Sequence, residues 1–292
     1  MTLDAAMALT PDEDRAMREG LIARASALVG RDGISDDFVR DLFGRVPSED
    51  LGRYSAKALG GLAVAAQAHL AAPRRPGGVA HVRLVDVTVG RDGRAQDLTV
   101  VEVVNDDRAY LLESTLAELN GRGLMPLLVA HPILGVARDA EGALVRVVGE
   151  ATAEARHGGP RESFIHIHLD RLDEPEARIG LSEGLARVYA DVAVVTDDHG
   201  AMLRLIDTLL ESDGYREPIP HLPETETREA AAFLEWLRDG HFTPLGMRTH
   251  VLDGAIVPDF AGTELGLLRD PAFQVLRLGR SFVDMTPEIA AF

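Results

Sequence analysis

One run of seven residues limits the fold of this chain more than any other feature of the sequence. Leu98-Thr-Val-Val-Glu-Val-Val104 is almost continuously apolar and rich in β-branched residues, which is typical of a strand covered on both faces. The run stops at Asn105-Asp106-Asp107, and leucines then recur at helical spacing. The sequence therefore predicts an interior strand over 98–104 and a helix over 107–122 on one face of its sheet. We expect that helix to bury Leu111, Leu112, Leu116 and Leu119.

Further strands and a long helix are predicted around this pair. Strand patterns cover 81–89, 124–136, 143–150 and 164–169, and Asp139-Ala-Glu-Gly142 forms the turn of a hairpin. A single helical period then runs through residues 185–210. This succession indicates an α+β fold, with one largely antiparallel sheet and its helices on a single face.

The first part of the chain, residues 1–76, has a helical character. Thr10 and Glu13 fit a capping box at the start of a helix. Shorter helices follow, and we expect Gly60-Gly61 to separate the third helix from the fourth. The region is rich in alanine and poor in large apolar residues, so we expect it to pack on something else. Residues 73–78 indicate a linker between this region and the α+β domain, which we place at 77–214.

The last part, residues 215–292, is predicted to begin a further α+β domain. Three prolines in 215–223 indicate a linker, and a short helix is expected over 227–237. A hairpin over 242–260, with its turn at Asp253-Gly254, follows. The sequence ends at Ala291-Phe292 without a helix-stop signal, and we expect the chain to continue beyond it.

Composition excludes several classes of partner and location. Asp and Glu number 47 against 30 Lys and Arg, for a formal charge of −17. Such a surface repels phosphate backbones and anionic lipids, so we expect neither nucleic acid nor membrane as a partner. The sequence holds no cysteine, which removes disulfides and thiolate chemistry. With no signal peptide and no apolar run long enough for a bilayer, the expected location is the cytoplasm.

The basic residues also limit the chemistry. Lys57 is the one lysine in the sequence, and its polar surroundings predict a solvated side chain. Schiff-base enzymes and phosphate-binding loops need a lysine at a defined place. No strand is followed by Gly-x-Gly-x-x-Gly, the signature of a dinucleotide-binding fold. A free-standing enzyme is therefore disfavoured.

Two groups of polar residues remain as candidate sites. Asn105, Asp106 and Asp107 join the central strand to its helix. They are candidates for binding an effector, and the alternative is that Asp106 or Asp107 caps the helix. His166 and His168 share one face of their strand. A His-x-His pair can ligate a metal, but a metal site needs a third ligand that the sequence does not place, so we predict no metal.

Three blocks of the sequence resemble a known protein family. The first runs through 99–124 to His131-Pro-Ile-Leu134, the second is Glu162-Ser-Phe-Ile-His-Ile-His-Leu-Asp170, and the third covers 231–248. In this order they resemble the amino-terminal region of the large NAD-specific glutamate dehydrogenases of bacteria. The resemblance extends over residues ~40–290.

The resemblance implies a non-catalytic part of a larger enzyme. In that family the amino-terminal part carries ACT-type domains, ferredoxin-like folds that bind amino acids or pair subunits, and the dehydrogenase site lies far downstream. It implies that this segment needs no cofactor, while the parent enzyme uses NAD. Expected partners are the chain's own catalytic region, a second subunit, or an amino-acid effector. The minimal ACT order is β-α-β-β-α-β, and the predicted order differs from it in two ways. An additional strand precedes the first strand of the motif, and no strand directly follows the second helix.

Overall fold

A computed structural model of the chain describes residues 10–30, 35, 37–91, 93–151, 159–211, 223–248 and 263–273. The chain divides into two compact units, Met1–Ala190 and Asp191–Phe292. The division into 1–76, 77–214 and 215–292 stays a prediction. Within the described ranges, no helix combines the length and the apolar character that crossing a bilayer requires.

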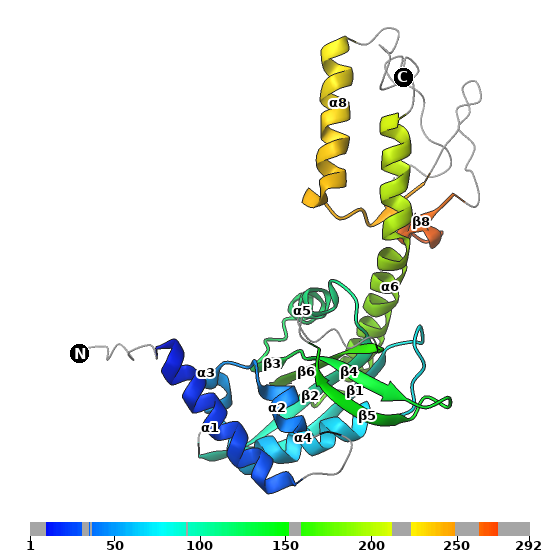
Figure 1. The fold of residues 1–292 in the computed structure, drawn as a ribbon. Coiled ribbons are helices and arrows are strands. Elements are labelled where there is room, and N and C mark those ends of the chain that lie inside the picture. The colour runs from blue at the N-terminus through cyan, green and yellow to red at the C-terminus, as the bar shows by residue number, and fades with distance from the viewer. Residues whose placement is uncertain are drawn as a thin grey trace. The chain divides into compact units, whose positions relative to one another are not determined.

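The first unit is built on an antiparallel sheet (Figure 1). Its strands are β1 (His81–Arg91), β2 (Arg94–Asp106), β3 (Leu128–Ala130), β4 (Ile133–Arg138), β5 (Leu144–Glu150) and β6 (Arg161–Asp170). The order is β1-β2-β6-β4-β5, and β3 also pairs with β6. All residues of β2 from Leu98 to Asn105 are buried. This confirms the interior strand, because alternating side chains of β2 are covered on both faces of the sheet.

Helices cover both faces of this sheet (Figure 1). The amino-terminal helices α1 (Pro11–Val29), α2 (Phe38–Phe43), α3 (Ser48–Leu51) and α4 (Ala56–Leu70) pack on one face. On the opposite face lie α5 (Leu111–Gly121) and the first part of α6 (Pro175–Glu211). The predicted α+β, ACT-like fold is confirmed, with its two helices on a single face. The sequence did not predict that the amino-terminal helices cover the other face of the sheet.

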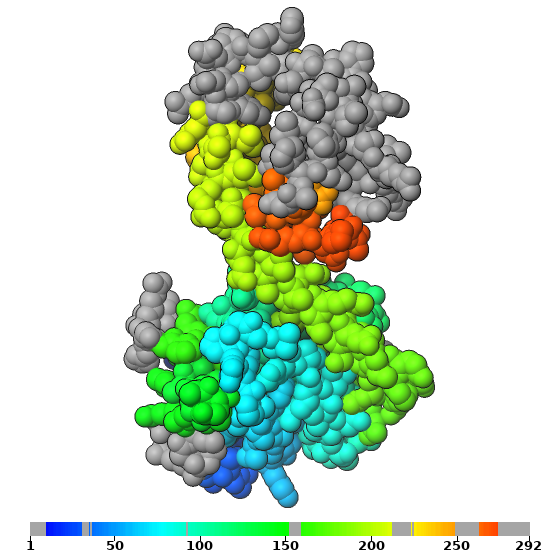
Figure 2. All heavy atoms as spheres, turned by 90° about the vertical axis from the view of Figure 1, so that its right-hand side faces the viewer, coloured from blue at the N-terminus to red at the C-terminus, as the bar shows by residue number. Residues whose placement is uncertain are grey.

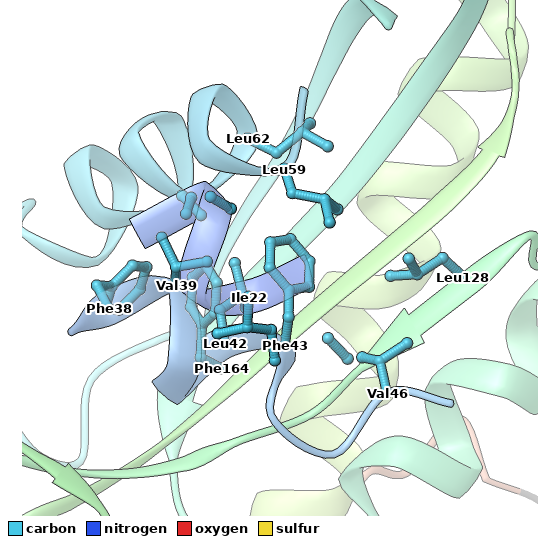
Figure 3. Packing of buried hydrophobic residues seen from close by; sticks show 14 of the residues in the cluster. Ile22, Phe38, Val39, Leu42, Phe43, Val46, Leu59, Leu62, Leu128 and Phe164 are labelled. Atoms are coloured by element: carbon cyan, nitrogen blue, oxygen red, sulfur yellow. The ribbon is translucent and has the colours of Figure 1, made fainter. Parts of the chain in front are cut away.

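The core of the unit lies between the amino-terminal helices and the sheet (Figure 3). Phe164 of β6 is fully buried there, with its ring centroid 6.3 Å from that of Phe38. Phe43 approaches the ring of His166 edge-on at 5.7 Å. Leu59 and Leu62 of α4 belong to the same core and are labelled in Figure 3. Burial of large apolar side chains at this interface is what attaches the helices to the sheet.

Gly60 and Gly61 do not separate two helices, contrary to the prediction. Helix α4 runs through both of them. A Cβ atom on Gly60 would lie 2.8 Å from Cγ2 of Val29 and 3.3 Å from the carbonyl oxygen of Ala25. Gly60 therefore allows α1 and α4 to approach closely, and the packing compensates for the low helix propensity of glycine. The capping box of Thr10 and Glu13 at the start of α1 is confirmed.

The buried face of α5 differs from the prediction. Leu111, Thr115 and Leu119 are buried, whereas Leu112 and Leu116 are only partly buried. Residues four apart lie on one helix face, and this face is the one turned to the rest of the unit. The hydroxyl of Thr115 donates to the carbonyl of Leu111 at 2.7 Å and lies 2.8 Å from the hydroxyl of Tyr189. These bonds allow a polar residue to occupy a buried helix position.

The predicted strand over 124–136 is divided into β3 and β4. Pro132 lies between them and has no N–H to contribute to the ladder, although its carbonyl accepts from the amide of Phe164 at 3.0 Å.

The hairpin of β4 and β5 is confirmed, and so is the long helix, which begins at Pro175. Figure 2 shows β1 and β2 in cyan and turquoise beside the yellow-green start of α6. There Arg178 donates to Asp86 at 2.6 Å.

The second unit contains the last part of α6 and the helix α8 (Glu224–Trp236), which continues into a π-helical turn at Leu237–His241. The predicted helix over 227–237 is confirmed. Short strands β7 (Gly246–Met247) and β8 (Leu265–Gly266) pair antiparallel, and a 3-10 turn, Leu267–Arg269, follows. The turn Asp253-Gly254, the second hairpin strand and residues 215–222 of the predicted linker lie outside the described residues.

Candidate functional site

The carboxyl end of β2 carries two of the predicted site residues, and both face a buried arginine. Arg74 follows α4 in the segment predicted as a linker, and its side chain is 1% exposed. Its Nη1 lies 2.7 Å from Oδ1 of Asp106, and its Nη2 donates to Oδ1 of Asn105 at 3.5 Å. Asp106 also accepts from the amide of Gly77 at 2.7 Å. The charge of Asp106 is thus engaged within the protein.

A second buried arginine completes this cluster. Arg138 of β4 forms a bidentate pair with Glu162 of β6, with both N–O distances at 2.8 Å. Its remaining N–H groups donate to the carbonyls of Leu70, Ala72 and Gly142 at 2.8 to 3.0 Å. Arg74 lies 3.1 Å from the same carboxylate. The cluster ties the end of α4 to the middle of the sheet, and sequence patterns missed it because an arginine in a loop normally indicates a solvated residue.

A pocket of about 420 Å³ opens beside the cluster. Arg75, Asp139 and Pro160 line it together with Arg74, Arg138 and Glu162. Its wall mixes both signs of charge. All five N–H groups of Arg138 already have acceptors, whereas Nε of Arg74, which also lines the pocket, has none among the described residues.

Asp107, the third predicted site residue, pairs with Arg161 at 2.7 Å. The alternative that Asp106 or Asp107 caps the helix is wrong. The amide of Asp107 still donates to the carbonyl of Arg161 at 3.1 Å, so the chain stays extended through this residue. Helix α5 begins four positions later at Leu111, and its N-cap residue is Tyr110, which makes no side-chain capping bond.

The backbone of Tyr110 is in the left-handed region, with φ 69°. Only glycine adopts this conformation without a steric penalty, and strained residues are frequent at functional sites. His131 is also near this junction, with Nε2 2.7 Å from the hydroxyl of Ser163. Burial lowers the pKa of His131, although the charges of Asp107 and Glu113 oppose this. The junction therefore combines acidic groups with a strained helix start.

His166 and His168 lie on one face of β6, as predicted, and both are fully buried. Their Nε2 atoms are 2.8 Å apart. His166 Nδ1 lies 3.1 Å from Oε1 of Glu102, and His168 Nδ1 lies 2.9 Å from the hydroxyl of Tyr54. In the part of the chain that the structure describes, no three His, Asp or Glu side chains are grouped as metal ligands. The pair is thus a link in a buried hydrogen-bonded chain.

Burial and partners shift the pKa values in this chain in defined directions. Burial alone raises the pKa of Glu102, but His166 and His69, whose Nδ1 atoms both lie 3.1 Å from its carboxylate, outweigh it and hold this pKa well below its usual value. Burial lowers the pKa of His168 well below its usual value, and the charge of Arg91, together with any positive charge on His166, acts in the same direction. Glu102 is therefore ionised and His168 neutral at pH 7.

Comparison with known proteins gives one consistent result. Residues 38–185 match the family described as glutamate dehydrogenase, ACT1 domain. The NAD-specific glutamate dehydrogenase of Halomonas elongata is 30% identical over 165 residues, 56% of this chain. Those of Pseudomonas aeruginosa and Mycobacterium tuberculosis are 28% and 27% identical over 56% and 58% of the chain.

The matched stretch is a small part of each relative, since it covers 10% of the length of all three. Within this chain, however, the family match includes all six strands of the sheet, both aspartates at the end of β2 and the histidine pair. The family match covers about half of the chain, and the chain therefore belongs to the glutamate dehydrogenase ACT1-domain family.

Proposed function

We propose that this chain is a non-catalytic regulatory and assembly module of a large NAD-dependent glutamate dehydrogenase. The parent reaction is the oxidative deamination of L-glutamate to 2-oxoglutarate and ammonia. NAD and the reacting groups belong, in this proposal, to the downstream part of the parent chain. Lys57, the one lysine, is exposed on α4, and the buried acids Glu102 and Glu162 are paired with arginines and histidines of the first unit.

The observation that carries the assembly role is an exposed aromatic surface on the second unit. Trp236 stacks on His241 and Phe233, with ring centroids 4.9 and 6.0 Å apart, and contacts Phe242 at 5.7 Å. Phe233, Trp236 and Phe242 are 56%, 41% and 62% exposed. Leu245, 56% exposed, follows close in sequence. Aromatic residues that gather on a surface are typical of contacts with another protein surface.

Replacing Phe242 by Ser should weaken association of the chain with its parent catalytic region or with a second copy by at least about tenfold, since central aromatic contacts dominate interface energies. Sedimentation or light scattering over a concentration series, alone and with the separately produced downstream region, measures it. Met125→Ser is the matched control, because Met125 is 70% exposed on the first unit. Equal association by wild type and Phe242→Ser would contradict the proposed surface.

An amino-acid effector site is the alternative function, and the β2–α5 junction favours it. The amides that begin α5 are suited to a carboxylate, while Asp107 and Glu113 favour an ammonium group. An α-amino acid carries both charges. The left-handed backbone at Tyr110 is the specific observation that supports a functional role for this junction. Asn105, Asp106 and Asp107 remain the predicted effector-binding residues.

A thermal-shift screen of the twenty amino acids at millimolar concentration tests this alternative. A ligand at ~100 times its dissociation constant adds about 2.7 kcal/mol to the stability of the fold, and NADH in the same screen should add nothing. Asp107→Asn should abolish the shift. Asp97→Asn is the control, because Asp97 lies near the other end of β2. If no amino acid moves the transition, the effector function is wrong and the assembly role stands alone.

A further inference from the structure

We propose that four buried side chains form a proton-sensitive latch between the amino-terminal helices and the sheet. The histidine latch consists of Tyr54, His168, His166 and Glu102. Tyr54 comes from the segment between α3 and α4, and the other three come from the adjacent strands β6 and β2. The two histidines and Glu102 are at most 2% exposed, and Tyr54 is 3% exposed. Neither the family match nor the proposed function assigns it a role.

The hydrogen bonds of the neutral latch have a single possible direction. Glu102 is an ionised acceptor, so Nδ1 of His166 carries a proton and donates to it. Nε2 of a neutral His166 is then an acceptor, and Nε2 of His168 must donate to it across 2.8 Å. Nδ1 of His168 is left as an acceptor and receives the hydroxyl proton of Tyr54 at 2.9 Å. Each nitrogen of the pair is satisfied in this arrangement.

One additional proton reverses part of this chain. Whichever of the two histidines holds it, the four ring nitrogens of His166 and His168 then comprise three N–H donors and one acceptor. Nδ1 of His168 changes from acceptor to donor, and the hydroxyl of Tyr54 must turn away and accept. A positive charge also arises at a fully buried position. Because the reversed hydrogen bond to Tyr54 can still form, the cost of the proton is the positive charge buried at the contact between Tyr54 and the sheet.

The surrounding charges do not compensate for this proton. On β1, Arg83 pairs with Glu102, and Arg91 lies over the Tyr54 ring with its guanidinium carbon 5.6 Å from the centroid. Both add positive charge. His69 of α4 contacts Glu102 at 3.1 Å, in a geometry that is not a straight hydrogen bond. Glu102 is thus shared among three cationic or titratable partners before the latch takes up a proton.

Among the described residues, the other elements packed on the latch, β3 and α2, meet it with apolar side chains rather than with an opposing charge. Ala130 and Leu128 of β3 pair with His166 and His168, and Phe43 of α2 presents a ring edge. Asp41, also on α2, bonds to Ser35 instead. Burial raises the pKa of Asp41 to about 6, against the hydrogen bond from Ser35. Its raised pKa means that protonation of Asp41 stabilises the fold as pH falls, so Asp41 opposes acid loosening.

The sign of the pH dependence follows from His168. Its pKa in the folded protein is lowered from the usual 6.5, so the neutral, closed latch contributes its full stability above pH 6.5. That stability is lost as pH falls below this value. If opening exposes His168, the opening constant of the amino-terminal helices rises by about tenfold per pH unit for each proton taken up.

Hydrogen–deuterium exchange on the whole chain between pH 8 and 5 tests the latch, after correction for the intrinsic pH dependence of exchange. Amides of α4 should lose protection as pH falls below about 6.5, while amides of α5 on the opposite face keep theirs. His168→Gln retains a donor and an acceptor but does not titrate. It should lower the slope for α4 by one proton, about tenfold per pH unit. His131→Gln, which removes a partly buried histidine outside the latch, should leave the slope unchanged.

Two outcomes would overturn the latch. One is an equal slope for wild type and His168→Gln, and the other is a parallel loss of protection in α4 and α5, which would mean ordinary acid unfolding. Should His168→Gln fail to fold, Tyr54→Phe provides the second measurement. It leaves Nδ1 of His168 without its donor, so α4 should already exchange at least about tenfold faster at pH 8. Unchanged exchange of α4 in Tyr54→Phe would equally contradict the proposal.

Discussion

Replacing Arg138 by Met should lower the free energy of unfolding by about 3–5 kcal/mol, the usual result of removing one partner from a buried ion pair. The side chain is 6% exposed, and that of Glu162 is 3% exposed. Methionine keeps much of the volume of the arginine stem, so the loss reports the charge and its hydrogen bonds. Arg74 remains beside Glu162 at 3.1 Å, but the carbonyls of Leu70 and Ala72 lose their donor.

Urea denaturation followed by circular dichroism measures this loss, and a midpoint of thermal unfolding lower by about 10 °C should accompany it. Arg161→Met is the matched control. Arg161 pairs with Asp107 through a side chain that is 45% exposed, and exposed pairs contribute about 0–1 kcal/mol. If Arg138→Met costs no more than Arg161→Met, the cluster does not hold α4 to the sheet.

Replacing Leu119 by Ala should cost about 2–5 kcal/mol, because the side chain is fully buried and leaves a cavity. Leu116→Ala should cost only ~1 kcal/mol, since a partly buried leucine loses less apolar surface and leaves no closed cavity. The two variants are controls for each other, because the same substitution is made in the same helix. Chemical denaturation with a shared slope gives both values. Equal costs would show that α5 is turned differently on the unit.

Local patterns in the sequence were sufficient for much of the fold. The apolar run at 98–104 indicated a strand covered on both sides, and β2 is interior. The two-residue period of a strand placed His166 and His168 on one face, and the capping box marked the start of α1. These features depend on residues within a few positions of each other, whose conformations are set by sterics and by local hydrogen bonds.

The rotation of helices and the role of glycines needed the tertiary structure. A helical pattern of leucines on α5 leaves several rotations open, and the sheet together with Tyr189 selects the one that buries Thr115. Two adjacent glycines normally indicate a break, but close packing of α1 holds Gly60 inside a continuous helix. In both cases contacts between distant elements outweigh a local preference of about 1 kcal/mol.

The sequence by itself thus determined most of the strand and helix segments, but not the buried face of α5 or the continuity of α4. The tertiary structure alone decided the partners of the candidate site residues. Arg74 meets Glu162 from 88 positions away, and Tyr54 meets His168 from 114 positions away. A charged or polar residue carries no local signal of its partner, because the pairing is stable only where the packed core removes both groups from water.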